Sequence, residues 1–143
     1  MASGKWRVTD ATLLRLALRL IGLMEFGGVI GIVMPTAWMA TVHEWLGLGP
    51  FPVGPVTPYM ARCLSAFYVM HGGFTWVASN DVRRYSGLIR YIAYSGILFS
   101  ILVCVLDVVA GFPWWWLLAE GPTLTVACMV FLVLDSRIRR HGT

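Results

Sequence analysis

Apart from the basic residues near one end, five ionisable residues lie inside otherwise apolar stretches of the chain, and their chemistry indicates what the protein could do. They are Glu25, Arg62, His71, Asp107 and Glu120. A charge in hydrocarbon costs about 2.5 to 3.5 kcal/mol on insertion scales, so each of these groups needs a partner, water or a function. A carboxylate beside an imidazole or a guanidinium can form a structural ion pair, bind a polar ligand or relay a proton.

Glu25 and His71 are expected at similar depth, near the middle of two apolar segments. Glycines share the helical face of Glu25, and Gly72 and Gly73 adjoin His71, so the two helices can approach closely. Two interpretations stay open. The residues form a buried hydrogen-bonded pair, or they form a proton relay or ligand site.

Arg62, Asp107 and Glu120 are expected within roughly 10 Å of one end of the apolar segments, the outer end. An ion pair of Arg62 with either carboxylate would hold three helices in register. The alternative is a small polar site that opens outward. Three residues of the preceding loop would cover or line that site: His43, Glu44 and Trp45.

The composition excludes a soluble protein. Of the 143 residues, 58% are hydrophobic and 13% are charged, whereas soluble domains have about 45 to 50% apolar and about 25% charged residues. So few charges cannot cover the surface of a water-soluble domain of this size. Soluble enzymes, disordered tails, coiled coils and disulfide-dense secreted folds are therefore excluded, and an integral membrane protein remains.

Four apolar segments are long enough to cross the hydrocarbon core, which takes about 20 helical residues. They cover residues 13–34, 59–78, 87–110 and 114–134. The last two links between them are so short that the helices they join must be antiparallel. The sequence therefore predicts a single all-α domain over residues 1–143, an antiparallel four-helix transmembrane bundle.

The outer loop, residues 36–58, contains no Lys or Arg. In its first half, Trp38, Val42 and Trp45 fall on one helical face, which predicts a short helix lying in the membrane interface. Its second half, residues 47–55, is rich in Gly and Pro and is predicted to return as an irregular strap.

The basic residues predict the orientation of the bundle. With four spans, both termini and the link between the second and third spans share one side of the membrane. That side would carry Lys5, Arg7, Arg83, Arg84, Arg137, Arg139 and Arg140, with Arg15, Arg19 and Arg90 entering the membrane from it. The other side would carry Arg62 alone. The positive-inside rule then places both termini in the cytoplasm.

Known catalytic and metal-binding patterns are missing from the sequence. Cys63, Cys104 and Cys128 form no C-x-x-C pair and imply no zinc site or disulfide framework. His71 is the one histidine expected at membrane depth, which excludes bis-histidine haem ligation. H-E-x-x-H, G-x-S-x-G and P-loop patterns do not occur, and no basic stripe suits nucleic acid. We expect no metal, no cofactor and no nucleic-acid partner.

Several stretches together resemble a known group of membrane proteins. They are Pro35-Thr-Ala-Trp-Met-Ala, His43-Glu-Trp-Leu-Gly-Leu-Gly, Leu64-Ser-Ala-Phe-Tyr-Val-Met-His-Gly-Gly, Asp81-Val-Arg-Arg-Tyr and Pro113-Trp-Trp-Trp-Leu-Leu-Ala-Glu-Gly-Pro. Over most of its length the chain resembles an uncharacterised family of small four-span bacterial membrane proteins, and more distantly the DoxX-like group. The resemblance implies a four-helix protein of the bacterial inner membrane. Some DoxX-like members are accessory subunits of quinone-reducing complexes, although this chain lacks a redox motif that would extend the analogy.

The sequence favours a non-enzymatic accessory or assembly component of the membrane, which self-associates or joins a larger complex. Small-residue faces support this interpretation, among them Gly27-x-x-x-Gly31. A second small-residue face runs along the third segment through Ala93, Gly96, Ser100, Cys104 and Asp107. Two alternatives stay open: the bundle binds a lipophilic small molecule, a quinone or a lipid, or it conducts protons or ions as an oligomer.

Overall fold

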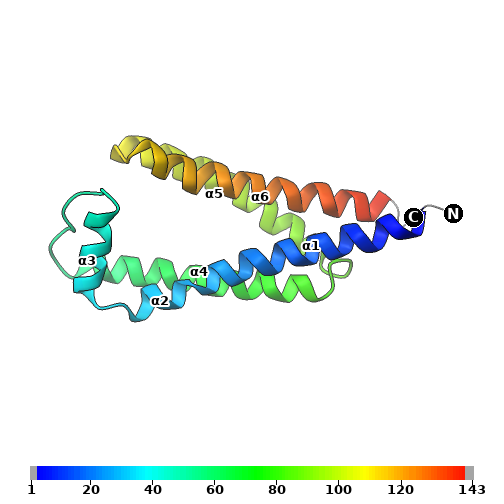
Figure 1. The fold of residues 1–143 in the computed structure, drawn as a ribbon, viewed down its shortest axis with the longest axis horizontal. Coiled ribbons are helices and arrows are strands. Elements are labelled where there is room, and N and C mark those ends of the chain that lie inside the picture. Colours follow the sequence, from blue (N-terminus) through cyan, green and yellow to red (C-terminus); the bar gives the residue numbers. More distant parts are fainter. Residues whose placement is uncertain (1–2, 141–143) are drawn as a thin grey trace. The chain divides into compact units, whose positions relative to one another are not determined.

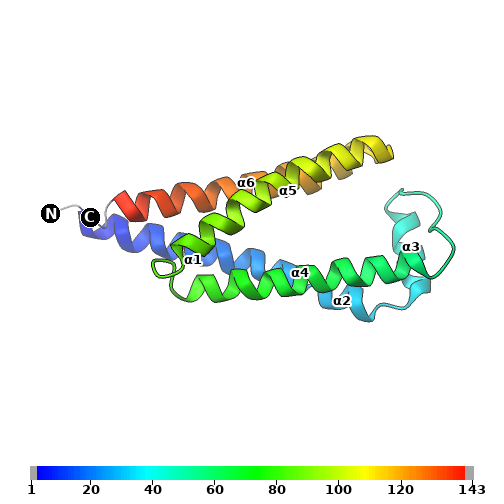
Figure 2. The same cartoon turned by 180° about the vertical axis from the view of Figure 1, so that it is seen from behind.

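The computed structural model describes the backbone of residues 3–140 and the side chains of residues 9–140. Over these residues the regular elements are all α-helices (Figure 1, Figure 2). They are α1 (Ser3–Phe26), α2 (Gly28–Val33), α3 (Thr36–Trp45), α4 (Val56–Asn80), α5 (Ser86–Ala110) and α6 (Trp114–Arg140). The side chains of Lys5 and Arg7, two of the predicted cytoplasmic basic residues, lie outside the described part. The all-α fold class is confirmed.

Three helical segments in the described part of the chain are long and apolar enough to cross a membrane. They are Thr9–Val33, which α1 and α2 share, Ser86–Ala110 and Trp114–Arg140. These segments agree with the predicted first, third and fourth spans. Helix α4 has 25 residues, but no stretch of it is as apolar as those three. The predicted second span, residues 59–78 in α4, and the complete four-helix bundle therefore stay predictions.

The first predicted span contains a break that its apolar pattern does not predict. Helix α1 ends at Phe26 and α2 begins at Gly28, with Gly27 between them. Helix α2 then ends after one and a half turns, because Pro35 forces the preceding Met34 into an extended conformation (φ −61°, ψ 130°). Pro35 in turn precedes the first residue of α3, where its missing N–H and fixed φ are compatible with a helix start.

The outer loop has the predicted two-part structure. Its first half forms α3, so the predicted helix is confirmed, while its position in the membrane interface stays a prediction. Its second half, residues 46–55, contains no helix, and it includes Gly47 and Gly49 with φ of 71° and 84°. Such positive φ values suit glycine, which has no Cβ to clash with the backbone. The irregular strap is therefore confirmed.

The chain divides into two compact units, which are described separately. The first unit comprises residues 1–21 and 75–143, and the second comprises residues 22–74. Helices α1 and α4 contribute residues to both units. The predicted single domain over residues 1–143 stays a prediction.

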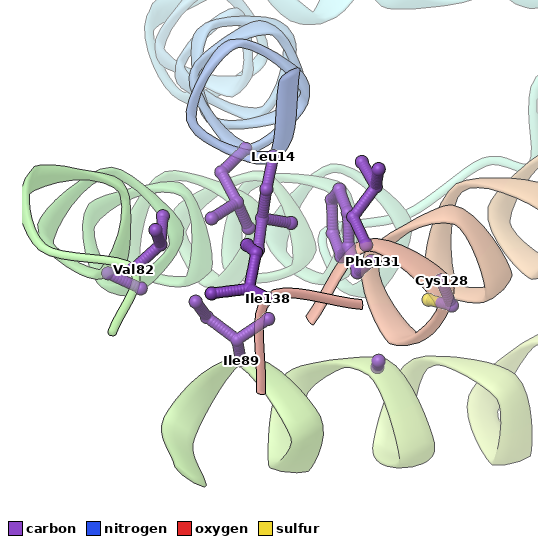
Figure 3. Close-up of a cluster of buried hydrophobic side chains, with 10 residues drawn as sticks. Leu14, Val82, Ile89, Cys128, Phe131 and Ile138 are labelled. Carbon is purple, nitrogen blue, oxygen red and sulfur yellow. The ribbon is translucent and has the colours of Figure 1, made fainter. Parts of the chain in front are cut away.

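In the first unit, α5 and α6 lie side by side, and a buried apolar cluster joins them to α1, to the end of α4 and to the link that follows α4 (Figure 1, Figure 3). The cluster contains Leu14, Leu18, Ala78, Val82, Ile89, Ala93, Cys128, Phe131, Leu134 and Ile138. Helices α5 and α6 approach closely at Gly96, which has no side chain. A Cβ at this position would lie 2.6 Å from the Cys128 sulfur. Ala93, Ser100 and Asp107 are also buried, so the predicted small-residue face is confirmed as a contact face between helices.

In the second unit, glycines bring α4 close to the α1–α2 segment. A Cβ on Gly28 would lie 2.7 Å from the Ser65 carbonyl oxygen, and a Cβ on Gly72 would lie 3.0 Å from both the Glu25 Cβ and the Gly22 carbonyl oxygen. A Cβ on Gly31 would overlap the Ser65 hydroxyl. Gly31 therefore packs against Ser65 of α4 in the same chain. It is then not free to form the self-association face that the Gly27-x-x-x-Gly31 pattern predicts.

The close contact at Gly28 predicts an effect on stability. We expect Gly28→Ala to lower the free energy of unfolding by about 1 to 3 kcal/mol, because the new Cβ would force the Ser65 backbone to move. Gly73→Ala is the matched control in the same unit, since a Cβ there meets no atom within 4 Å, and alanine is favoured over glycine in a helix by up to about 1 kcal/mol. Thermal unfolding of both variants in detergent, followed by circular dichroism, tests this. Equal Tm values would contradict the described packing.

Candidate functional site

Glu25 and His71 form a hydrogen-bonded pair in the second unit, and this contact is compatible with both interpretations that the sequence leaves open. The distance from His71 Nδ1 to Glu25 Oε1 is 2.7 Å. Glu25 lies in the last turn of α1 and His71 lies in α4 beside Gly72, whose lack of a side chain lets the two helices approach at this point. The pair is therefore held by the helix contact that the glycines permit.

The two members of this pair differ in exposure. The Glu25 side chain is 14% exposed and the His71 side chain is 42% exposed. Among the described residues, Glu25 Oε2 is buried and has no hydrogen-bond partner. Glu25 belongs to the candidate span Thr9–Val33. The pair thus combines a buried acceptor with a half-exposed imidazole, an arrangement that can accept a further donor or be covered by another molecule. Its use as a ligand site or proton relay stays a prediction.

Arg62 bonds mainly to backbone carbonyls within its own unit. Its Nε donates to the Ile32 carbonyl oxygen at 3.2 Å, and its Nη2 donates to the Met34 carbonyl oxygen at 3.0 Å. These carbonyls lie at the end of α2, where no later turn of helix supplies N–H donors and where the helix dipole favours a cation. Further donations reach Thr36 and the Pro58 carbonyl. The predicted ion pair with Asp107 or Glu120 joins residues of different units and stays a prediction.

Asp107 and Glu120 belong to the first unit and have different surroundings. Asp107 is 5% exposed, and its Oδ2 has no hydrogen-bond partner among the described residues. Glu120 is half-buried and accepts a hydrogen bond of 2.7 Å from Trp116 Nε1, one turn earlier in α6. The two carboxylates are close enough for their charges to interact.

His43, Glu44 and Trp45 end α3, next to the strap. His43 Nδ1 donates to the Gly49 carbonyl oxygen at 2.9 Å, and its ring meets the Phe51 ring edge-on at 5.4 Å between centroids. Through these two contacts the strap packs against the end of α3. Glu44 is exposed and Trp45 is 83% exposed. Their predicted role as a lid or path to a polar site stays a prediction.

Two polar clusters of the first unit were not predicted. Asp135 is 1% exposed and accepts hydrogen bonds from Ser86 Oγ at 2.6 Å and from Arg139 Nε at 2.9 Å. Ser79 accepts from Arg15 Nε at its carbonyl oxygen and from Arg19 Nε at its hydroxyl. The four-residue spacing of Asp135 and Arg139 is a signal that could have revealed the first cluster. Nothing in the sequence marks Ser79 as the shared acceptor.

The described residues contain no group of three or more His, Cys, Asp or Glu side chains placed to hold a metal ion. Comparison of the chain with protein-family models, with curated proteins and with solved structures finds no match. The function is therefore argued from the geometry of the polar groups.

The Glu25–His71 contact predicts a measurable coupling. We expect His71→Ala to be the more destabilising single change, because it leaves both oxygens of the mostly buried Glu25 without a partner. Glu25→Ala leaves only a half-exposed imidazole. The double variant should be more stable than the sum of the single effects predicts, by about 1 to 3 kcal/mol.

The measurement is unfolding of the four proteins in mixed detergent micelles with increasing dodecyl sulfate. Glu44→Ala, at an exposed site of α3, serves as the control and should leave stability within about 0.5 kcal/mol of the parent. Strictly additive effects of the two single changes would show that the hydrogen bond does not contribute to stability.

Proposed function

We propose that the chain is a four-span protein of the bacterial inner membrane that acts as a non-enzymatic accessory or assembly component of a membrane complex. The first support is the position of α4. His71 of α4 bonds to Glu25, which belongs to the candidate span Thr9–Val33. When that span lies in the bilayer, the middle of α4 lies at the same depth.

Helix α4 also has the length and the internal partners that a span needs. Its 25 residues extend about 37 Å at about 1.5 Å per residue, more than the hydrocarbon thickness of about 30 Å. Its two basic side chains, Arg62 and His71, both bond to the α1–α2 segment. Internal partners of this kind compensate for its lower hydropathy, because a polar group in lipid is costly only where it stays unsatisfied.

The charge distribution supports cytoplasmic termini. The link between α4 and α5 carries Arg83 and Arg84, and α6 ends in Arg137, Arg139 and Arg140. The loop between α2 and α4 contains no Lys or Arg. With four spans this is the asymmetry that the positive-inside rule describes.

The observation that carries the accessory function is the exposure of His71. A row of exposed apolar side chains runs along α4 beside it, and we name this row the α4 stripe: Leu64, Phe67, Met70 and Phe74. At mid-membrane, a 42% exposed imidazole is unfavourable against lipid chains. A transmembrane helix of a partner, packed on the α4 stripe, would bury the imidazole and supply polar contacts to it.

A second candidate function follows from Glu25. Its Oε2 is buried and without a partner among the described residues, so a hydroxyl of a lipophilic molecule such as a quinol or a lipid would find an acceptor there. In this case the small molecule, rather than a partner helix, covers the pair. The two functions make different predictions about what lies on the α4 stripe.

Labelling of single cysteines tests whether α4 crosses the membrane. Cys63, Cys104 and Cys128 are first replaced by alanine, and a cysteine is then placed at Val53 or at Arg84, both exposed and on either side of α4. A membrane-impermeant maleimide should label Val53→Cys in intact spheroplasts and Arg84→Cys only after lysis. Labelling of both sites from the same side would contradict the four-span topology.

Photo-crosslinking tests the accessory function. A photoreactive amino acid replaces Phe67 on the α4 stripe or, as the control, Val126 on α6, each of which is 63% exposed. In native membranes we expect a protein adduct at position 67 only, and we expect His71→Phe to reduce its yield at least threefold. Mass spectrometry identifies the adduct. A quinone adduct at position 67 would replace the accessory function by the second candidate, and lipid adducts alone at both positions would contradict both.

A further inference from the structure

Two arginines of the first unit share one acceptor residue and retain free donors. Arg15 and Arg19 lie one turn apart on α1, and both use Nε to bond to Ser79 of α4, at 3.2 Å to its carbonyl oxygen and at 3.4 Å to its hydroxyl. The Ser79 hydroxyl is oriented in turn by its own bond of 2.6 Å to the Trp76 carbonyl oxygen. Ser79 therefore holds two guanidinium groups next to each other, although like charges repel.

Neither arginine is neutralised within the described residues. The ion pairs found there involve Glu25 with His71 and Asp135 with Arg139. Because the bonds of Arg15 and Arg19 run through Nε, their terminal amino groups remain available as donors. Both side chains are exposed. Two adjacent and anchored guanidinium groups without an ion-pair partner among the described residues are suited to an anion with several acceptor oxygens, and phosphate matches the donor fork of arginine.

An aromatic side chain completes the arrangement. The Arg19 guanidinium carbon lies 5.6 Å from the centre of the Trp76 ring, within the range of a cation–π contact. The Trp76 side chain is 37% exposed. Tryptophan is enriched at the depth of lipid headgroups, where an amphipathic ring contacts both chains and water.

The location points to a lipid as the source of the phosphate. Ser79 lies in the last turn of α4, directly before Asn80, Asp81 and the basic link to α5. On the four-span topology, on which this step rests, the end of α4 is at the cytoplasmic membrane surface. Basic sites between helices at that surface bind anionic lipid headgroups. Exposed apolar residues of the same helices, Leu16, Leu20 and Val77, are available to the acyl chains.

We propose that Arg15, Arg19 and Trp76 form a binding site for the phosphate group of an anionic phospholipid, with Ser79 as the residue that positions both arginines. The phosphodiester accepts hydrogen bonds from the terminal amino groups of the two arginines. Trp76 packs beside the headgroup and keeps Arg19 in place.

The test is native mass spectrometry of the purified full chain in neutral detergent, titrated with phosphatidylglycerol, phosphatidylcholine or inorganic phosphate. We expect preferential retention of phosphatidylglycerol. Arg15→Gln/Arg19→Gln should weaken its binding roughly 10- to 30-fold, from about 1 kcal/mol per arginine near a membrane surface. Arg83→Gln/Arg84→Gln removes the same charge from the neighbouring link and should change binding less than threefold. Equal losses in the two double variants, or equal binding of the two lipids, would overturn the proposal.

Two further measurements keep the proposal testable if the glutamine variant does not fold. Ser79→Ala keeps the net charge and removes only the hydroxyl that holds Arg19, and we expect it to weaken lipid binding about threefold with an unchanged circular dichroism spectrum. Full affinity in Ser79→Ala would contradict its positioning role. Inorganic phosphate that binds as tightly as the lipid would show a free-phosphate site and overturn the lipid assignment. These measurements need no partner protein, so failure of the accessory function leaves them unaffected.

Discussion

The structure depends on the requirement that polar groups at membrane depth find partners inside the chain. At the end of the first candidate span, two backbone carbonyls need such partners. Pro35 ends α2, so the carbonyls of Ile32 and Met34 lack the N–H donors that a further helical turn would supply. Arg62 bonds to both carbonyls. Arg62 in α4 thus satisfies the carbonyls that Pro35 leaves without donors, and these two hydrogen bonds also align α4 with α2.

Small residues make these internal partners reachable. Gly72 lets α4 approach α1 until His71 and Glu25 are in hydrogen-bond contact. In the first unit, Ser100 is buried against α6 and bonds to the Gly121 carbonyl oxygen at 2.7 Å and to the Thr125 hydroxyl at 2.6 Å. The hydrogen bonds between helices therefore occur where small residues let the helices pack closely, because such a bond needs backbones that are near each other.

The sequence predicts the parts of this protein that depend on periodicity and composition. Helix positions, the strap after α3 and the small-residue face of α5 follow from spacing and hydropathy, and the meeting of Glu25 and His71 follows from depth along two helices. The partners of Arg62 and the shared acceptor Ser79 do not follow. Both are carbonyl or hydroxyl oxygens, which nearly every residue offers, so side-chain charges alone carry no information about which oxygen a long arginine reaches.

The polar groups fall into two classes with different consequences. Arg62 and Asp135 have their hydrogen bonds completed by the chain itself, which identifies them as structural. Glu25 and Asp107 each keep a buried oxygen without a partner among the described residues, and Arg15 and Arg19 keep exposed donors. Since an unmatched polar group in lipid is unfavourable, the second class is where another molecule gains most by binding. The few charges of this chain thus separate into those whose hydrogen bonds are made within the chain and those that keep an unused donor or acceptor.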